Sequence, residues 1–121
     1  MRAELIQLQQ AEQKDKVDEA LLESIDETMI AVLSREVADA LYLHLQTVYS
    51  IPRDEVPHKI ETLCLTLENI FGVSGTATIC KAIARRLFVK LGLTFPTSPA
   101  RTLPEYVKEA EVRSRERGIQ V

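Results

Sequence analysis

Apolar side chains recur every three or four residues through the first 51 positions, the spacing of one buried helix face. If a single helix continued through both segments at about 100° per residue, the apolar stripe of 17–33 and the apolar stripe of 37–49 would point to nearly opposite sides of that helix. One straight helix would then need partners on both sides. We therefore predict two helices broken near Ser34, whose hydroxyl can cap the second. The stripes are Val17, Leu21, Ile25, Met29 and Val32, followed by Val37, Leu41, Leu45 and Val48.

The pattern also divides the chain at both ends. Residues 1–14 carry a weaker apolar patch and are expected to form a frayed helix or an arm that docks on another subunit, before a helix capped by Asp15 or Asp18. A helical core domain is predicted over 15–93. A proline-containing connector over 94–101 then leads to a docking helix over 102–121.

Glycine and proline appear only from Pro52 onward and set the boundaries of the second half. Asp54 is positioned to cap a helix that runs to a left-handed stop at Gly72, and a second helix closes at Gly92. The short link Gly72–Gly75 predicts an antiparallel helix hairpin over 55–91. We thus expect an all-α bundle of about five helices centred on this hairpin, and a dimer.

The C-terminal helix opens with the spacing of a capping box, Thr102-Leu103-Pro104-Glu105. Leu103, Tyr106, Val107 and Ala110 would dock it on the core. The charged residues 113–117 that follow are expected to project into solvent.

Composition removes several classes of protein. The chain has 121 residues, 45% hydrophobic and 27% charged, as is ordinary for one globular domain. No secretory leader and no membrane span are visible, so we expect a cytoplasmic protein without a membrane partner.

Residues 1–61 carry a charge of −7 and residues 62–121 carry +4, so the acidic helices could meet the basic half of another subunit. Glu19, Glu23, Asp26 and Glu27 should form a solvated face.

Neither a metal nor a cofactor site is expected. His44, His58, Cys64 and Cys80 make up a Cys₂His₂ set, but they lack the close pairs that fold ligands around zinc. The cysteines are interpreted as small core hydrophobes. A disulfide between them is the remaining alternative, although hairpin geometry would pair Cys64 with Ile83 rather than with Cys80. No arrangement of nucleophile and base is visible, so no catalytic residue is assigned and the protein is not expected to be an enzyme.

His44 is the most informative single polar residue, because it lies on the apolar side of its predicted helix. The structural interpretation is a core or interface histidine with a satisfied hydrogen bond. The functional alternative is a small-molecule pocket that His44 shares with Tyr42 and Tyr49.

The block 41–93 resembles the Nitrosopumilus output domain family, small archaeal helical proteins of unknown function. The resemblance rests on Tyr49-Ser50-Ile51, on Asp54-Glu55 with Pro57, and on Ile70-Phe71-Gly72 before a helix that ends at Gly92. Ser50 stands where the family tends to have glycine. The resemblance implies an all-helical fold and a signalling or output role, and it brings no catalytic residues.

The sequence therefore favours a non-enzymatic association module that acts as a homodimer. Its predicted association face is Val17, Leu21, Ile25, Met29 and Leu41, because the two opposed stripes call for more than one neighbour. The first alternative is a ligand-sensing domain with a pocket near His44. A weaker alternative is a nucleic-acid-binding accessory protein that uses Arg85 and Arg86, which the net charge of −3 disfavours.

Overall fold

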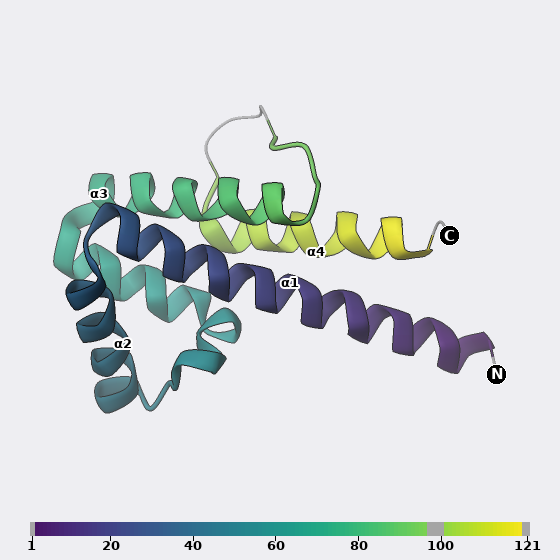
Figure 1. Cartoon of the computed structure of the whole chain (residues 1–121), viewed down its shortest axis with the longest axis horizontal. Helices are drawn as coiled ribbons and strands as arrows, with labels where there is room; N and C mark the ends of the chain where they lie inside the picture. Colours follow the sequence, from purple (N-terminus) through teal and green to yellow (C-terminus); the bar gives the residue numbers. More distant parts are fainter. Residues whose placement is uncertain (1, 97–100, 120–121) are drawn as a thin grey trace.

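The structure is a computed structural model that describes residues 2–96 and 101–119, with side chains over 15–96 and 101–116. This part of the chain is helical and holds no strand, so the all-α prediction is confirmed. Figure 1 shows a long first helix with the other helices packed along its C-terminal part. The elements are α1 (Arg2–Val32), α2 (Arg35–Tyr49), the 3₁₀ helix η1 (Arg53–His58), α3 (Ile60–Lys90) and α4 (Leu103–Ile119).

The break between the first two helices lies where the opposed stripes predicted it. The hydroxyl of Ser34 accepts a hydrogen bond from the Val37 amide at 3.1 Å and so caps α2. Toward the N-terminus, α1 passes through Asp15 and Asp18 without a break. The side chains of the arm predicted over 1–14 lie outside the described residues.

The apolar stripe of α1 is buried inside a single chain. Val17, Leu21, Ile25 and Met29 are fully buried, and Leu41 of α2 is 5% exposed. The prediction that these five side chains form an association face is therefore wrong. The reason is tertiary: α3 and α4 both pack along α1 and cover the stripe that a second subunit was expected to cover.

The chain reverses direction within α3. Gly72 has φ 79° and ψ 173°, a conformation essentially reserved for glycine, and Figure 1 shows the ribbon of α3 bending back between its two halves. The Sγ atoms of Cys64 and Cys80 lie 3.8 Å apart, whereas a straight helix would separate these residues by about 24 Å. Gly75 is helical, so the reversal occupies one residue rather than the predicted link Gly72–Gly75, and Gly72 is not in the left-handed helical region.

The segment before α3 also differs from its prediction. A helix was expected to start at Asp54, but no side-chain hydrogen bond caps η1, which follows Pro52, and α3 begins only at Ile60. The interruption lies at Lys59, whose φ of −130° and ψ of 43° are not helical, whereas Pro57 lies inside η1. Val56 and Pro57 are buried, so η1 contributes to the core.

Both predicted caps of the C-terminal half are confirmed. Gly92 closes α3 at φ 68°, and the Leu93 amide donates to the Phe88 carbonyl at 2.8 Å, as in a Schellman motif. The amide of Thr102 donates to Glu105 at 2.9 Å, and the amide of Glu105 donates back to the Thr102 hydroxyl at 3.4 Å. The four docking residues predicted for α4 are buried: Leu103, Tyr106, Val107 and Ala110.

The charged end of α4 is only partly solvated. Ser114 is buried, and Arg113 donates to the Thr94 carbonyl at 2.8 Å, so the prediction that 113–117 all project into solvent is wrong for these two. Arg115 and Glu116 are exposed, and the side chain of Arg117 lies outside the described residues. Of the connector 94–101, the structure describes 94–96 and 101, and Phe95 stacks on Tyr106 with ring centroids 5.2 Å apart.

Over the described residues, α3 is long and apolar enough to cross a membrane by length and composition. The evidence is weak, because the core helix of a bundle meets the same criteria. In this fold the helix reverses at Gly72, and Leu63, Leu67, Ile83 and Leu87 are fully buried against its neighbours.

Candidate interaction surface

Acidic residues of the N-terminal half and basic residues of the C-terminal half form ion pairs within the same chain. Lys90 of α3 lies 2.9 Å from Glu27 and 3.5 Å from Glu23 of α1. The hydrogen bond to Glu27 raises the pKa of Lys90. Arg86 donates to the buried hydroxyl of Thr28 at 3.1 Å. In the acidic face predicted to be solvated or to meet another subunit, Glu23 and Glu27 are exposed but pair with α3 of the same chain, and Asp26 pairs with Arg53 of η1 at 3.4 Å.

Helix α2 presents a different kind of surface. Its charged residues are Arg35, Glu36 and Asp39, and none of the residues 40–52 is Asp, Glu, Lys or Arg. Leu43 is 62% exposed and Val48 58%. We define the α2 face as five exposed residues that span about 140° of the helix: Val37, Ala40, Leu43, His44 and Val48.

The one hydroxyl in the middle of the α2 face is turned back on the helix. Thr47 donates to the Leu43 carbonyl at 2.9 Å, which satisfies the hydroxyl locally. The ring of Tyr49 packs edge-on against His44, with centroids 6.0 Å apart. The surface is therefore apolar and aromatic, with His44 as its main polar group.

An apolar groove runs beside the α2 face. It encloses about 180 Å³, and every lining residue except His44 is hydrophobic. Ile70 and Phe71, directly before the reversal at Gly72, form its second wall. The lining residues are Leu33, Val37, Ala40, Leu41, His44, Ile70 and Phe71.

Of the three residues of the predicted ligand pocket, the structure brings His44 and Tyr49 together and places Tyr42 apart from them. His44 lines the groove and is exposed, so it is not a core histidine, and the expectation of an interface histidine stays a prediction. Tyr49 contacts His44 without lining the groove. Tyr42 is buried elsewhere on α2, with the Arg53 guanidinium 5.4 Å from its ring centroid. Burial, and then the neighbouring Asp26, raise the pKa of Tyr42, which is therefore a neutral structural residue.

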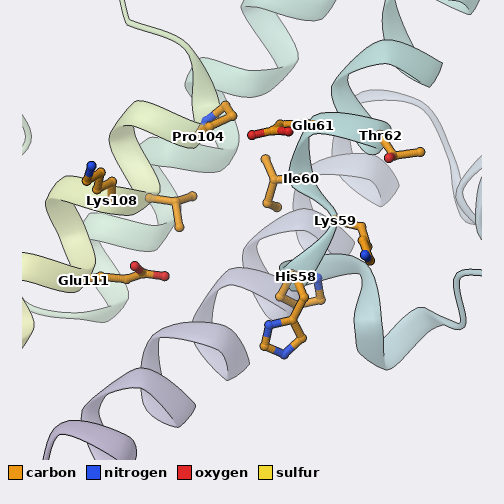
Figure 2. A pocket seen from close by; sticks show the side chains of 10 residues that line it. His58, Lys59, Ile60, Glu61, Thr62, Pro104, Lys108 and Glu111 are labelled. Carbon is orange, nitrogen blue, oxygen red and sulfur yellow. The ribbon is translucent and has the colours of Figure 1, made fainter.

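A second cleft, of about 510 Å³, separates the start of α3 from α4. Figure 2 shows Ile60 projecting between His58 and Lys59 on one side and Lys108 and Glu111 of α4 on the other. His58 lies 3.4 Å from Asp18, which ties η1 to α1. Acidic and basic side chains alternate around this cleft, so its charge favours neither anions nor cations.

A third cavity, of about 450 Å³, contains both cysteines. Among the described residues, no group of three His, Cys, Asp or Glu side chains is placed to hold a metal ion. Cys64 was expected to lie beside Ile83. In the structure, the sulfur of Cys64 instead faces the sulfur of Cys80. The reversal over a single residue shifts the register of the two halves of α3 relative to the expected longer link.

The basic residues considered for nucleic-acid binding are largely occupied. Arg85 lies over the ring of Phe95, 5.4 Å from its centroid, and Arg86 faces Thr28 and Glu27. In comparisons with known proteins, no family model, no curated protein and no solved structure matches the chain. The surface chemistry of the fold is therefore the basis for assigning a function.

Proposed function

We propose that this protein is a non-enzymatic helical association module that acts as a cytoplasmic homodimer and pairs through the α2 face. The observation that carries the proposal is the exposed helix surface without charge between Ala40 and Pro52. In this proposal α3 is an antiparallel helix hairpin whose bend supports that face. A signalling or output role, as the family resemblance implies, would be exerted through the same contact.

The composition of the α2 face supports an interface. The centres of protein interfaces are depleted of charged residues, whereas an ordinary exposed helix face carries several. Leu43 and Val48 expose more than half of their surface, and the groove beside them adds Ile70 and Phe71. Burying this continuous apolar surface would be favourable at roughly 25 cal/mol per Å².

A second copy is the occupant that fits this surface best. A two-fold axis near His44 would lay the two α2 helices antiparallel, with Ala40 of each opposite Val48 of the other. The charged first turn at Arg35, Glu36 and Asp39 would then lie at the rim, beside the uncharged end of the other α2. No like charges would face each other at the centre of such a contact.

Sedimentation velocity across micromolar concentrations tests the proposal. We expect a concentration-dependent monomer–dimer equilibrium for the wild-type protein. Val48→Glu should abolish the dimer, because it places a carboxylate against the apolar Ala40 of the other copy at two points of the contact, while the 58% exposure of Val48 leaves the monomer folded.

Val89→Glu is the matched control. Val89 is 77% exposed, more than Val48, and it lies at the far end of α3 from α2. The control should dimerise as the wild type does. A wild-type protein that stays monomeric, or a dimer that Val89→Glu disrupts as strongly as Val48→Glu, contradicts the proposal.

The groove supports a second candidate, a ligand-sensing domain. Its volume of about 180 Å³ suits a small apolar molecule, and His44 supplies one polar contact. This candidate predicts that an apolar metabolite raises the melting temperature of the wild type and not of His44→Ala. Because His44 is exposed, that variant should fold normally.

A further inference from the structure

The sulfur atoms of Cys64 and Cys80 face each other across the two halves of α3. They lie 3.8 Å apart, both cysteines are free thiols, and Cys80 is 8% exposed while Cys64 is half-buried. A disulfide needs the sulfurs about 1.8 Å closer. The two halves of α3 are joined through the non-helical Gly72, so a small change at this joint can bring the sulfurs together.

Both thiols line the same solvent-accessible pocket of about 450 Å³. Thr76 is one of the lining residues, and its buried hydroxyl has no hydrogen-bond partner among the described residues. Glu61 and Glu68 supply negative charge, and the positive charge of Arg101, which is paired with Glu109, lies beside them. This combination of thiols, a hydroxyl and both signs of charge suits a small zwitterionic molecule.

We propose that Cys64 and Cys80 form a dithiol–disulfide redox site whose oxidant is a low-molecular-weight disulfide bound in this pocket. One cysteine thiolate attacks a sulfur of the bound disulfide, so a mixed disulfide forms and one small thiolate leaves. The second cysteine then attacks the protein-side sulfur and releases the other small thiolate. The protein loses two protons and two electrons, that is two hydrogen atoms, and the small disulfide is reduced to two thiols.

The thiol–thiol contact supports this order of events. The hydrogen bond from Cys64 lowers the pKa of the Cys80 thiol, because it stabilises the thiolate. The same contact, together with burial, raises the pKa of Cys64. Cys80 is therefore the more acidic thiol of the pair, which suits it to attack first in a stepwise exchange.

The test exposes the full chain to increasing ratios of oxidised to reduced glutathione, followed by acid quenching, alkylation of free thiols and intact-mass measurement. The wild type should convert to a species two hydrogens lighter, with no alkylation and no glutathione attached. Cys64→Ser and Cys80→Ser cannot close the ring, so each should accumulate one glutathione on its remaining cysteine.

The wild type unfolded in urea provides the reference for native geometry. Because the fold holds the sulfurs close together, the folded chain should form the disulfide at a clearly lower oxidised-to-reduced ratio than the unfolded chain. An equal midpoint in both states overturns the proposal even if a serine variant fails to fold. A folded wild type that keeps two alkylatable thiols, carries two glutathiones or cross-links between chains also overturns it.

Discussion

The guanidinium of Arg86 in α3 donates a hydrogen bond to the hydroxyl of Thr28 in α1, across 3.1 Å. Thr28 is fully buried, and Arg86 also lies 3.9 Å from the carboxylate of Glu27. A residue that could have formed part of a basic external surface thus satisfies a buried polar group between two helices.

Arg86→Met is expected to lower the free energy of unfolding by about 1–3 kcal/mol, because it leaves the buried Thr28 hydroxyl without its partner. Adding Thr28→Val should recover most of that loss, since both polar groups are then gone. Urea denaturation measures both effects. Lys81→Met, an exposed position on the same helix, is the control and should change stability by less than about 0.5 kcal/mol. A double variant as unstable as Arg86→Met would contradict the pairing.

Gly72→Ala is expected to destabilise the protein by about 1–3 kcal/mol through backbone strain. A Cβ at this position would meet nothing within 4 Å, so the cost comes from φ 79° and not from a clash. Thermal and urea unfolding would report it. Val73→Ala, at the neighbouring exposed residue, should have little effect, and an equal loss in both variants would rule out the conformational explanation.

Ser50→Gly should stabilise the protein by up to about 1 kcal/mol. Ser50 ends α2 at φ 57° and is the one described non-glycine residue in the left-handed region. Glycine adopts this conformation without steric cost. Gln46→Gly, at an exposed helical position four residues earlier, should instead destabilise by roughly 0.5–1 kcal/mol. Urea denaturation should therefore show a higher free energy of unfolding for Ser50→Gly and a lower one for Gln46→Gly. A lower value for both variants would contradict the prediction.

The capping box at α4 makes stability depend on pH. The hydrogen bond from the Thr102 amide, followed by that from its hydroxyl, lowers the pKa of Glu105 below its ordinary value. A carboxyl whose pKa is lower in the folded state stabilises the protein above its unfolded-state pKa, and loses this contribution as pH falls through the folded-state pKa.

Melting temperatures of the wild type and Glu105→Gln across the acidic range test this sign. The advantage of the wild type should be present near neutral pH and shrink on acidification. Glu116→Gln removes an exposed carboxylate from the other end of α4 and serves as the charge-matched control. An advantage of the wild type that grows at low pH would contradict the assigned sign.

Local signals predicted the parts of the fold that depend on neighbouring residues. The cap at Ser34, the capping box at Thr102 and the stop at Gly92 are each encoded within a few positions and are present in the structure. Ser24 and Thr28 were missed as buried polar residues, although both lie on the apolar stripe of α1 and could have been found from its period. Nothing local indicated that Arg86 would satisfy Thr28, because the two residues are far apart in the sequence.

By itself, the sequence determined that this protein is helical, where its main breaks fall and which stripes are apolar, because helix caps, glycines and periodicity act over a few residues. The tertiary structure decided what covers each stripe. The reversal at Gly72 and the return of α4 bury Leu21 and Ile25 within one chain and leave the α2 face exposed. They also bring Cys64 beside Cys80. Periodicity specifies that a face must be buried, but the partner of that face depends on the path of the whole chain.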